Sequence, residues 1–315
     1  MKWLIMGTGG VGGYFGGRLA EAGRDVVFVA RGEHLQALRR DGLRVSSVAG
    51  DFAVHPVHAV EDPAAAGPTD AVLFAVKSWQ TGPAARALVP AIGPTTCVLS
   101  LQNGATAAEE IGAVVGRERM LGGVCRLVAF RSAPGEITHA GIDPEVVVGE
   151  LDGSRTERLE AVLADLRDCR GVRAVPADDI ERAIWAKFLF IAAVSGVGAV
   201  TRVPAGRFRA VPETRRLLEA ALREVETVAR ARGVALAGDV VDSTLAFIDG
   251  LPAEATASMQ RDLTAGRPSE LDALSGAVVR LGRAAGVATP VHGLLYAALR
   301  PQEMVARSPG PPPAG

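Results

Sequence analysis

A glycine-rich stretch near the N-terminus constrains the fold of this chain more than any other feature. Residues 7–12 read Gly-Thr-Gly-Gly-Val-Gly and match the pattern G-x-G-x-x-G. The apolar residues 3–6 before it predict a short strand, and residues 14–22 after it predict a helix that ends at Gly23. A strand, a glycine turn and a helix in this order form the first unit of a dinucleotide-binding α/β fold. Because the chain has 37 glycines, the pattern alone is weak, and its position between a strand and a helix carries the argument.

The glycines of this turn have separate physical tasks. Gly7 permits the tight turn, Gly9 lets the backbone approach a pyrophosphate, and Gly12 lets the helix pack closely on the strand. The phosphates then meet free N–H groups at the positive end of the helix. The alternative is a glycine-rich turn that binds nothing. We assign the whole turn to cofactor binding: Gly7, Thr8, Gly9, Gly10, Val11 and Gly12.

The segments that follow alternate between strands and helices. Strands are predicted over 25–30, 70–76 and 96–101, and a helix is predicted over 33–41. This alternation predicts a parallel sheet with helices on both faces, which is a Rossmann-type doubly wound domain. Between 121 and 150 the pattern changes to strands with turn signals at Pro134-Gly135 and Ala140-Gly141, and a helix follows over 156–168.

After about residue 177 the sequence shows helical patterns and no convincing strand. Gly233, Gly266 and Gly286 stand where three of the helices would end. We therefore expect an α/β fold in which residues 1–176 form the Rossmann-type, dinucleotide-binding domain. Residues 177–307 would form an all-α domain, and residues 308–315 a flexible tail. The helices are predicted over 178–199, 213–232, 239–249, 253–265 and 269–285.

The residue that follows the second predicted strand indicates which nicotinamide cofactor is preferred. NAD sites usually place a carboxylate there, which holds the ribose 2′-hydroxyl and repels a 2′-phosphate. Here the residue is Arg31, whose guanidinium would attract that phosphate. The sequence therefore predicts NADP(H) as the cofactor, and the alternative is a solvated arginine beside Glu33.

Polar residues also follow two further predicted strands. Lys77 comes directly after the strand at 70–76, and Asn103 comes soon after the strand at 96–101. Ligands of an open parallel sheet lie outside the carboxyl ends of its strands. We therefore expect both residues to contact the cofactor and Asn103 to contact the substrate as well. The alternative is a surface lysine and an ordinary Asn-Gly turn.

Composition narrows the range of partners. The formal net charge of −1 argues against nucleic acid as the main partner. The three cysteines are scattered, so they predict neither a disulfide framework nor a metal site, and a reducing cytoplasm is the expected setting. The apolar run at the N-terminus is too short for a signal peptide or a membrane span. We expect a cytoplasmic protein with no metal and no membrane partner.

Taken together, an ordered set of motifs over about residues 1–300 resembles the ketopantoate reductase (2-dehydropantoate 2-reductase) family. The resemblance implies an NADPH-dependent oxidoreductase that reduces a 2-oxo acid to a 2-hydroxy acid. The family's namesake reaction converts ketopantoate to pantoate in pantothenate biosynthesis. The resemblance also implies that the helical domain 177–307 takes part in substrate binding and forms a homodimer. The motifs are the glycine turn, Ala30-Arg31, Val76-Lys77-Ser78, Leu101-Gln102-Asn103-Gly104, Trp185-Ala186-Lys187-Phe188, Ser258-Met259-Gln260-Arg261-Asp262 and the segment from Ala265 to Asp272.

The resemblance also implies catalytic roles. It assigns the general acid to Lys187, which lies near the apolar face of its predicted helix, where partial desolvation suits proton donation. It places Glu270 in the active site near the cofactor ribose, and it makes Ser258 a hydrogen-bond partner of substrate oxygens. The alternatives are a lysine whose stem packs while its ammonium reaches water, a first-turn helix acid and a solvated serine.

The substrate-reading positions depart from the family pattern. Pantoate-forming members carry asparagines four and eight residues after the catalytic lysine, where this chain has Ile191 and Ser195. Both share a helical face with Lys187, so we predict that they line the substrate pocket. Ketopantoate is the leading substrate. Because Ile191 cannot form a hydrogen bond with a substrate through its side chain, a more apolar 2-oxo acid is an alternative. A non-catalytic NADP(H)-binding sensor and an enzyme working mainly from alcohol to ketone are the other hypotheses.

Overall fold

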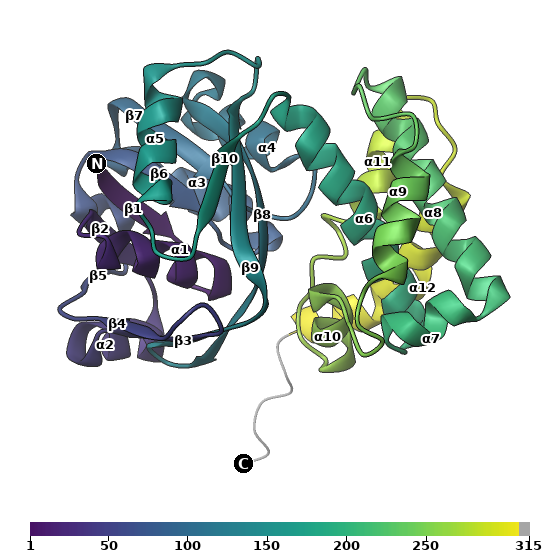
Figure 1. Ribbon diagram of the computed structural model, residues 1–315, viewed down its shortest axis with the longest axis horizontal. Helices are drawn as coiled ribbons and strands as arrows, with labels where there is room; N and C mark the ends of the chain where they lie inside the picture. Colours follow the sequence, from purple (N-terminus) through teal and green to yellow (C-terminus); the bar gives the residue numbers. More distant parts are fainter. Residues whose placement is uncertain (309–315) are drawn as a thin grey trace. The chain divides into compact units, whose positions relative to one another are not determined.

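The computed structural model describes residues 1–308, which divide into two compact units (Figure 1). Unit 1 comprises Met1–Gln102 and Thr106–Ile184, and unit 2 comprises Asn103–Ala105 and the chain from Trp185 onwards. The division therefore falls between Ile184 and Trp185, within the long helix α6 (Ile180–Thr201). The sequence analysis placed the boundary a few residues earlier, between 176 and 177. The functions of the two domains stay predictions, and all of the predicted tail after Ser308 lies outside the described residues.

Unit 1 is built on a ten-stranded sheet with the order β4-β3-β9-β8-β7-β6-β1-β2-β5, and β10 pairs with β9. The strands from β5 across to β8 pair in parallel, which confirms the Rossmann-type prediction. The rest of the sheet is mixed: β8 with β9 and β3 with β4 pair antiparallel, whereas β3 and β10 pair with β9 in parallel. The strands are β1 Lys2–Met6, β2 Asp25–Val29, β3 Leu43–Ser47, β4 Phe52–Val54, β5 His58–Val60, β6 Thr69–Phe74, β7 Ile92–Ser100, β8 Met120–Ala133, β9 Glu136–Glu150 and β10 Arg173–Pro176.

The long hairpin of β8 and β9 explains both predicted turn signals. Pro134-Gly135 is its turn, as predicted, and a turn this short makes the two strands antiparallel. Ala140-Gly141 is not a turn but lies inside β9. The pairing there jumps from Arg126↔Glu145 to Val128↔Ala140, so the signal marks an irregular stretch of the ladder, and Gly141 has a φ of +84°.

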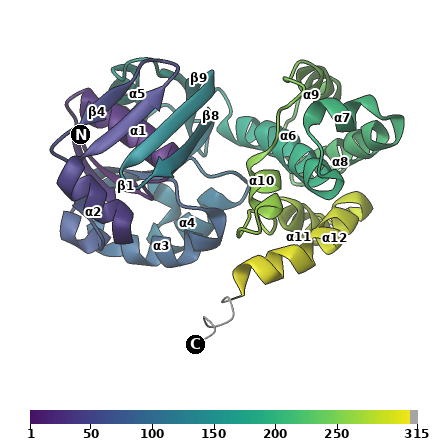
Figure 2. The ribbon, with the colours of Figure 1, turned by 90° about the horizontal axis from the view of Figure 1, so that it is seen from below.

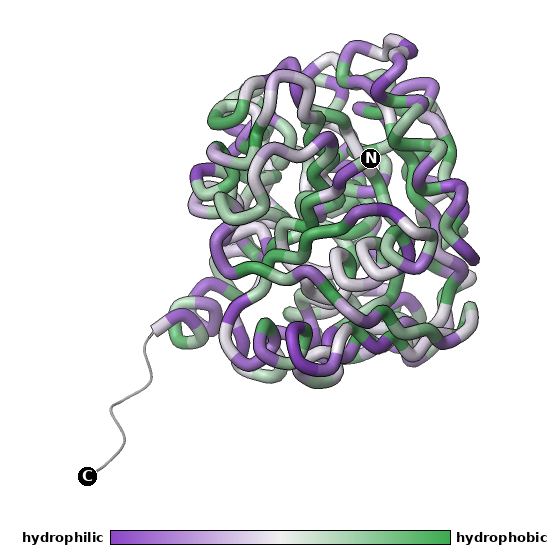
Figure 3. The backbone as a smooth tube through the Cα atoms, turned by 90° about the vertical axis from the view of Figure 1, so that its left-hand side faces the viewer, coloured by the Kyte–Doolittle hydropathy of each residue, from purple (hydrophilic) through white to green (hydrophobic). Residues whose placement is uncertain are grey.

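Helices cover both faces of the sheet of unit 1, with α1 and α5 on one face and α3 and α4 on the other (Figure 2). Successive residues of β1 point to opposite faces. Trp3 and Ile5 therefore enter the core beneath α1 and α5, whereas Leu4 and Met6 enter the core beneath α3 and α4. Seen from the side of unit 1, hydrophobic stretches run through its interior strands (Figure 3). The helices are α1 Gly10–Glu21, α2 Gly32–Asp41, α3 Thr81–Leu88, α4 Ala107–Val115 and α5 Glu157–Arg167, with short 3-10 turns at Pro63–Ala66, Ser78–Gln80, Val89–Ala91 and Arg117–Arg119.

Helix α1 begins at Gly10, earlier than the predicted start at residue 14. Glycine inside a helix usually costs about 1 kcal/mol, which is why the sequence favoured a longer turn. Close packing accounts for these glycines. A Cβ on Gly16 would lie 2.7 Å from Ile5 Cγ1, and a Cβ on Gly17 would lie 2.9 Å from Leu43 Cδ2. The helix can rest on the sheet at this distance only because glycines occupy these two positions.

All the regular structure of unit 2 within the described residues is helical. The predicted helices over 253–265 and 269–285 began too early, and α7 and α12 were not predicted. Gly233, Gly266 and Gly286 follow helices with φ of +86°, +65° and +69°, which confirms them as helix-terminating glycines. The helices are α6 Ile180–Thr201, α7 Ala205–Ala210, α8 Pro212–Ala231, α9 Val240–Asp249, α10 Ser258–Thr264, α11 Ser275–Ala284 and α12 Pro290–Arg307.

Helix α6 is long and apolar enough to cross a membrane when judged by length and composition alone, with a mean hydropathy of 1.9 in its most apolar window. In the fold, 61% of that window is buried. Trp185, Phe188 and Leu189 of this helix belong to the hydrophobic core of unit 2. The composition of α6 therefore matches that of a core helix.

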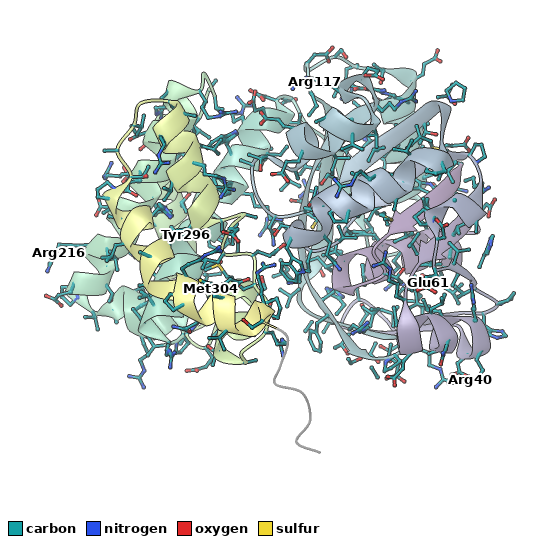
Figure 4. All side chains as sticks on the ribbon, turned by 180° about the vertical axis from the view of Figure 1, so that it is seen from behind. Arg40, Glu61, Arg117, Arg216, Tyr296 and Met304 are labelled. Carbon is teal, nitrogen blue, oxygen red and sulfur yellow. The ribbon has the colours of Figure 1, made fainter. Side chains whose placement is uncertain are left out.

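Charged side chains occupy the periphery of both units. Arg40, Arg117 and Arg216 project from the surface in Figure 4, and Arg216 pairs with Glu213 on the same helix at 3.1 Å. Exposed pairs of this kind contribute little to stability. They fit a solvated helix face.

Stability should fall on mild acidification because of His292, which is fully buried at the start of α12. Its Nε2 lies 3.1 Å from the Ala221 carbonyl oxygen, and its Nδ1 has no partner among residues 1–308. Burial lowers the pKa of His292 to about 4. Because the unfolded chain binds this proton near pH 6.5, the stabilising effect is fully present above that pH and is lost as pH falls towards 4.

We expect the free energy of unfolding of wild type to drop between pH 7 and pH 5 by on the order of 2 kcal/mol more than that of His292→Gln. Denaturant titrations at several pH values measure the difference. His58→Gln is the control, because His58 is exposed and should leave the pH dependence as in wild type. Equal pH dependence in wild type and His292→Gln would contradict this account.

Candidate functional site

The glycine turn of unit 1 is held by very close contacts between backbone segments. Gly7 has a φ of +102°, and a Cβ there would lie 2.7 Å from Val76 Cγ1. A Cβ on Gly12 would lie 2.1 Å from the Gly7 carbonyl oxygen, and one on Gly10 would lie 2.2 Å from the Ala129 carbonyl oxygen. Three of the four glycines are therefore required by packing alone.

Gly9 differs from the other glycines of the turn. A Cβ on Gly9 would meet no atom within 4 Å, and among residues 1–308 its N–H has no hydrogen-bond partner. Gly9 is also the N-cap of α1 and supplies no side-chain cap, so the first N–H groups of the helix remain open. Backbone donors at an uncapped helix start suit an anion such as a phosphate.

Thr8, between Gly7 and Gly9, is held on both sides. Its N–H and its hydroxyl both donate to the Val29 carbonyl oxygen, at 3.2 and 2.9 Å. Its own carbonyl oxygen lies 2.8 Å from Nε2 of His34. The sequence analysis missed His34. The available signal was a histidine on the buried side of α2, three residues after Arg31.

Arg31 is the N-cap of α2, directly after the end of β2. Its side chain is exposed, and within residues 1–308 it makes no hydrogen bond or ion pair, including none with Glu33. Arg31 therefore lies just after the carboxyl end of β2, and no carboxylate of the described residues pairs with its guanidinium. Its preference for a 2′-phosphate stays a prediction.

Lys77 follows β6 and is exposed, with Nζ 5.7 Å from the ring centroid of Trp79. The ends of the parallel strands are joined side by side, because the Ala75 N–H donates to the Met6 carbonyl and the Leu101 N–H to the Phe74 carbonyl. The carboxyl ends of β1, β2 and β6 therefore share one edge of the sheet. This edge of unit 1 brings together the glycine turn, Arg31 and Lys77.

Unit 2 brings Asn103 close to Glu270, although they are far apart in the sequence. Asn103 Nδ2 lies 3.4 Å from Glu270 Oε2, and the neighbouring Gly104 approaches the Ala273 carbonyl oxygen so closely that a Cβ would lie 3.3 Å from it. Glu270 is buried. The interpretation of Glu270 as a first-turn helix acid is wrong, because α11 begins only at Ser275.

A hydrogen-bonded cluster fixes the residue just before Glu270. The fully buried carboxylate of Glu303, on α12, accepts the Ser269 N–H at 3.0 and 3.1 Å and the Ser269 hydroxyl at 2.5 Å. Arg307 pairs with Glu303 at 2.5 Å and donates to the Ser269 carbonyl oxygen at 3.0 Å. Both polar groups of the Ser269 backbone are thus satisfied by one helix, which restricts the position of Glu270.

Lys187 lies on α6 and is half-buried, and within residues 1–308 its ammonium makes no hydrogen bond or ion pair. Ile191, one turn further on, is also half-buried. Ser195 is fully buried, and its Oγ has no partner in the described part of the chain. Ser258 is half-buried as the first residue of α10. Their contacts with a substrate stay predictions, and that of Ser195 has no exposed atom to support it.

Within residues 1–308, no group of three or more histidine, cysteine, aspartate or glutamate side chains is arranged to hold a metal ion. The site residues instead offer backbone N–H groups, cationic side chains, the side-chain amide of Asn103 and the buried carboxylate of Glu270. These groups suit the recognition of phosphates and carboxylates by charge and hydrogen bonding.

Comparison with known proteins identifies the family. Residues 3–153 match the family model "Ketopantoate reductase PanE/ApbA", and residues 179–303 match "Ketopantoate reductase PanE/ApbA C terminal". The chain belongs to the ketopantoate reductase family. It is therefore an oxidoreductase of that family, as the motifs indicated.

Individual relatives span almost the whole chain. An "Uncharacterized oxidoreductase YkpB" of Bacillus subtilis is 32% identical over 96% of this chain and 99% of its own length. A 2-dehydropantoate 2-reductase of Halobacterium salinarum is 32% identical over 92% of this chain and 95% of its own. The crystal structure of a PanE/ApbA family ketopantoate reductase from Ralstonia eutropha is 34% identical, with a TM-score of 0.89, and covers 98% of this chain and 100% of that one. A D-mandelate dehydrogenase structure with NADH and anilino(oxo)acetate, 22% identical with a TM-score of 0.87, shares the fold.

The glycines of the turn should separate into packing and binding positions. Gly12→Ala would place a Cβ 2.1 Å from a backbone oxygen. We therefore expect the free energy of unfolding to fall by at least about 1–3 kcal/mol. Gly9→Ala meets no atom and has a φ of −86°, so its melting temperature should equal that of wild type. Dinucleotide binding should nevertheless weaken in Gly9→Ala. A destabilised Gly9→Ala, or one that binds like wild type, would contradict the assignment.

Proposed function

We propose that this chain is an NADPH-dependent reductase of 2-oxo acids, with 2-dehydropantoate as the leading substrate. Family membership supports the reductase activity. The observation that carries the proposal is Lys187, a half-buried lysine on the core helix α6 whose ammonium makes no hydrogen bond or ion pair among residues 1–308. An ammonium without a protein partner is available to a negatively charged group of a ligand. A substrate that carries a carboxylate and gains negative charge on a carbonyl oxygen supplies such a group.

The residues of unit 1 fit a nicotinamide dinucleotide. The open space at Gly9 and the uncapped start of α1 would accept the pyrophosphate, and the unpaired Arg31 would accept the 2′-phosphate of NADPH. Lys77 adds positive charge on the same edge of the sheet. The D-mandelate dehydrogenase of the same fold was solved with NADH, so the fold alone does not choose the cofactor and Arg31 carries the choice.

In the proposed reaction, the residues of unit 1 would hold NADPH, which would supply a hydride for the ketone carbon of the 2-oxo acid. Lys187 donates a proton to the ketone oxygen as negative charge develops there, which gives a 2-hydroxy acid. Glu270, with Asn103 3.4 Å from its carboxylate, orients the reacting groups by hydrogen bonding. Lys187, as the neutral amine, would accept the proton again if the reaction ran from alcohol to ketone.

Substrate choice depends on the position four residues after Lys187. Ile191 is half-buried and offers no hydrogen bond, whereas pantoate-forming family members place an asparagine there. Loss of one such contact costs about tenfold to a hundredfold in catalytic efficiency. A 2-oxo acid with an apolar side chain is therefore the second substrate candidate. Ser258 remains the proposed hydroxyl partner of the substrate.

We also propose a cytoplasmic location and a homodimer. Cys97, Cys125 and Cys169 are all free and buried, which suits a reducing compartment. Gel filtration and fractionation of cells test these two points.

Lys187→Met should abolish turnover while leaving cofactor binding intact. Methionine keeps most of the packing of the lysine stem but cannot donate a proton, so we expect kcat to fall by about 10²–10⁴. NADPH absorbance measures turnover with a panel of 2-oxo acids that includes ketopantoate and more apolar acids. Arg182→Ala, which removes an exposed cation from the same helix, is the control and should retain activity.

The outcomes separate the hypotheses. Turnover of an apolar acid in preference to ketopantoate would assign the chain to a paralogue within the family. Binding of NADPH without turnover of any acid in either direction would favour a non-catalytic sensor and sink the reductase proposal. Full activity in Lys187→Met would remove the lysine from the mechanism.

Arg31→Ala should weaken the binding of NADPH by about tenfold to a hundredfold and leave the binding of NADH nearly unchanged, because only NADPH carries the 2′-phosphate. Fluorescence titrations with both cofactors give the two dissociation constants. Arg40→Ala is the matched control, since Arg40 is an exposed arginine near the other end of α2. Equal losses for NADPH and NADH in Arg31→Ala would refute the role of Arg31.

A further inference from the structure

A buried histidine connects three separate segments of unit 1 at the glycine turn. His34 is on α2 and only 4% exposed. Its Nε2 lies 2.8 Å from the Thr8 carbonyl oxygen of the turn. Its Nδ1 accepts the N–H of Gly135, at the tip of the β8–β9 hairpin, at 2.9 Å. One imidazole thus joins the glycine turn, α2 and the hairpin tip.

The two partners fix the protonation of this ring. The Gly135 N–H can only donate, so Nδ1 must be unprotonated and act as the acceptor. The hydrogen of the neutral ring is then on Nε2 and donates to the Thr8 carbonyl oxygen. Burial lowers the pKa of His34, which favours the same neutral form. The contact with Thr8 is therefore a directed hydrogen bond.

This bond determines which way the next amide points. In a trans peptide the C=O and the N–H of the same unit point in opposite directions. Because the Thr8 carbonyl is directed at His34, the Gly9 N–H is directed away from it. That N–H has no partner among residues 1–308, and the space beside the Gly9 Cα is open to 4 Å. The free amide and the open space mark where the proposed pyrophosphate would approach.

We propose that His34 is a positioning residue of the cofactor site, which orients the Thr8–Gly9 peptide so that the Gly9 N–H faces the pyrophosphate. The inference rests on the proposed dinucleotide-binding function of unit 1. His34 also ties the first turn of α2, which follows the N-cap Arg31, to the glycine turn. A single side chain thereby orients the N–H group proposed to bind the pyrophosphate and fixes the start of the helix that follows Arg31.

Two amide substitutions separate the two hydrogen bonds of His34. The glutamine amide reaches the position of Nε2, so His34→Gln keeps a donor for the Thr8 carbonyl. The shorter asparagine amide reaches only the position of Nδ1, so His34→Asn keeps the Gly135 bond and loses the Thr8 bond. We expect the NADPH dissociation constant to rise about tenfold in His34→Asn and less than about threefold in His34→Gln. Both variants should lose melting temperature to a similar extent.

Competition by inorganic pyrophosphate supplies a second measurement, and its inhibition constant should rise in the same order. His58→Asn, at an exposed histidine of the same unit, is the control and should bind like wild type.

The proposal is overturned if the two His34 variants lose affinity equally, or if their losses follow only their melting temperatures. His34 would then be a packing residue. If His34→Asn does not fold, a rise beyond threefold in folded His34→Gln overturns it, and a smaller rise supports it. A wild-type protein that binds neither NADPH nor NADH would overturn the proposed function itself.

Discussion

The fold of unit 1 depends on a very close approach between backbone segments at the start of α1. A Cβ on Gly12 would stand 2.1 Å from the Gly7 carbonyl oxygen, and one on Gly10 would stand 2.2 Å from the Ala129 carbonyl oxygen. Interiors are packed too densely to absorb an added methyl at such distances. The depth at which α1 lies on the sheet follows from these contacts, because only glycine leaves room for them.

The sequence revealed the parts of the molecule that depend on short, local patterns. The G-x-G-x-x-G pattern, the apolar strands and the helix-ending glycines Gly233, Gly266 and Gly286 each report a backbone conformation that few other residues allow. Long-range pairing was harder to predict. Strands β3, β5 and β10 are short and pair in parallel with strands that are distant in the sequence, so no local pattern marks them.

The same distinction applies to the candidate site. Gly9 and Arg31 could be selected from the sequence because their chemistry follows from their place after a strand. His34 was missed, because its hydrogen bond with Gly135 joins two positions about a hundred residues apart in the sequence, and a histidine three residues after Arg31 was a weak signal by itself. Glu270 was selected by family resemblance, but its local setting was misjudged, because the segment before α11 is held by α12 through Ser269 and not by helix geometry.

The contact between α12 and Ser269 has a practical consequence for work with this protein. Glu303 and Arg307 lie in the last described turns of the chain, and between them they satisfy the backbone of the residue that precedes Glu270. Truncating the C-terminal helix before Glu303 would remove both anchors, and an affinity tag fused close behind Arg307 could strain them. Expression designs that place the purification handle at the N-terminus also carry a risk, because the terminal ammonium of Met1 lies 3.5 Å from Asp165. A flexible spacer after residue 308 is the arrangement that leaves both ends of the fold as they are.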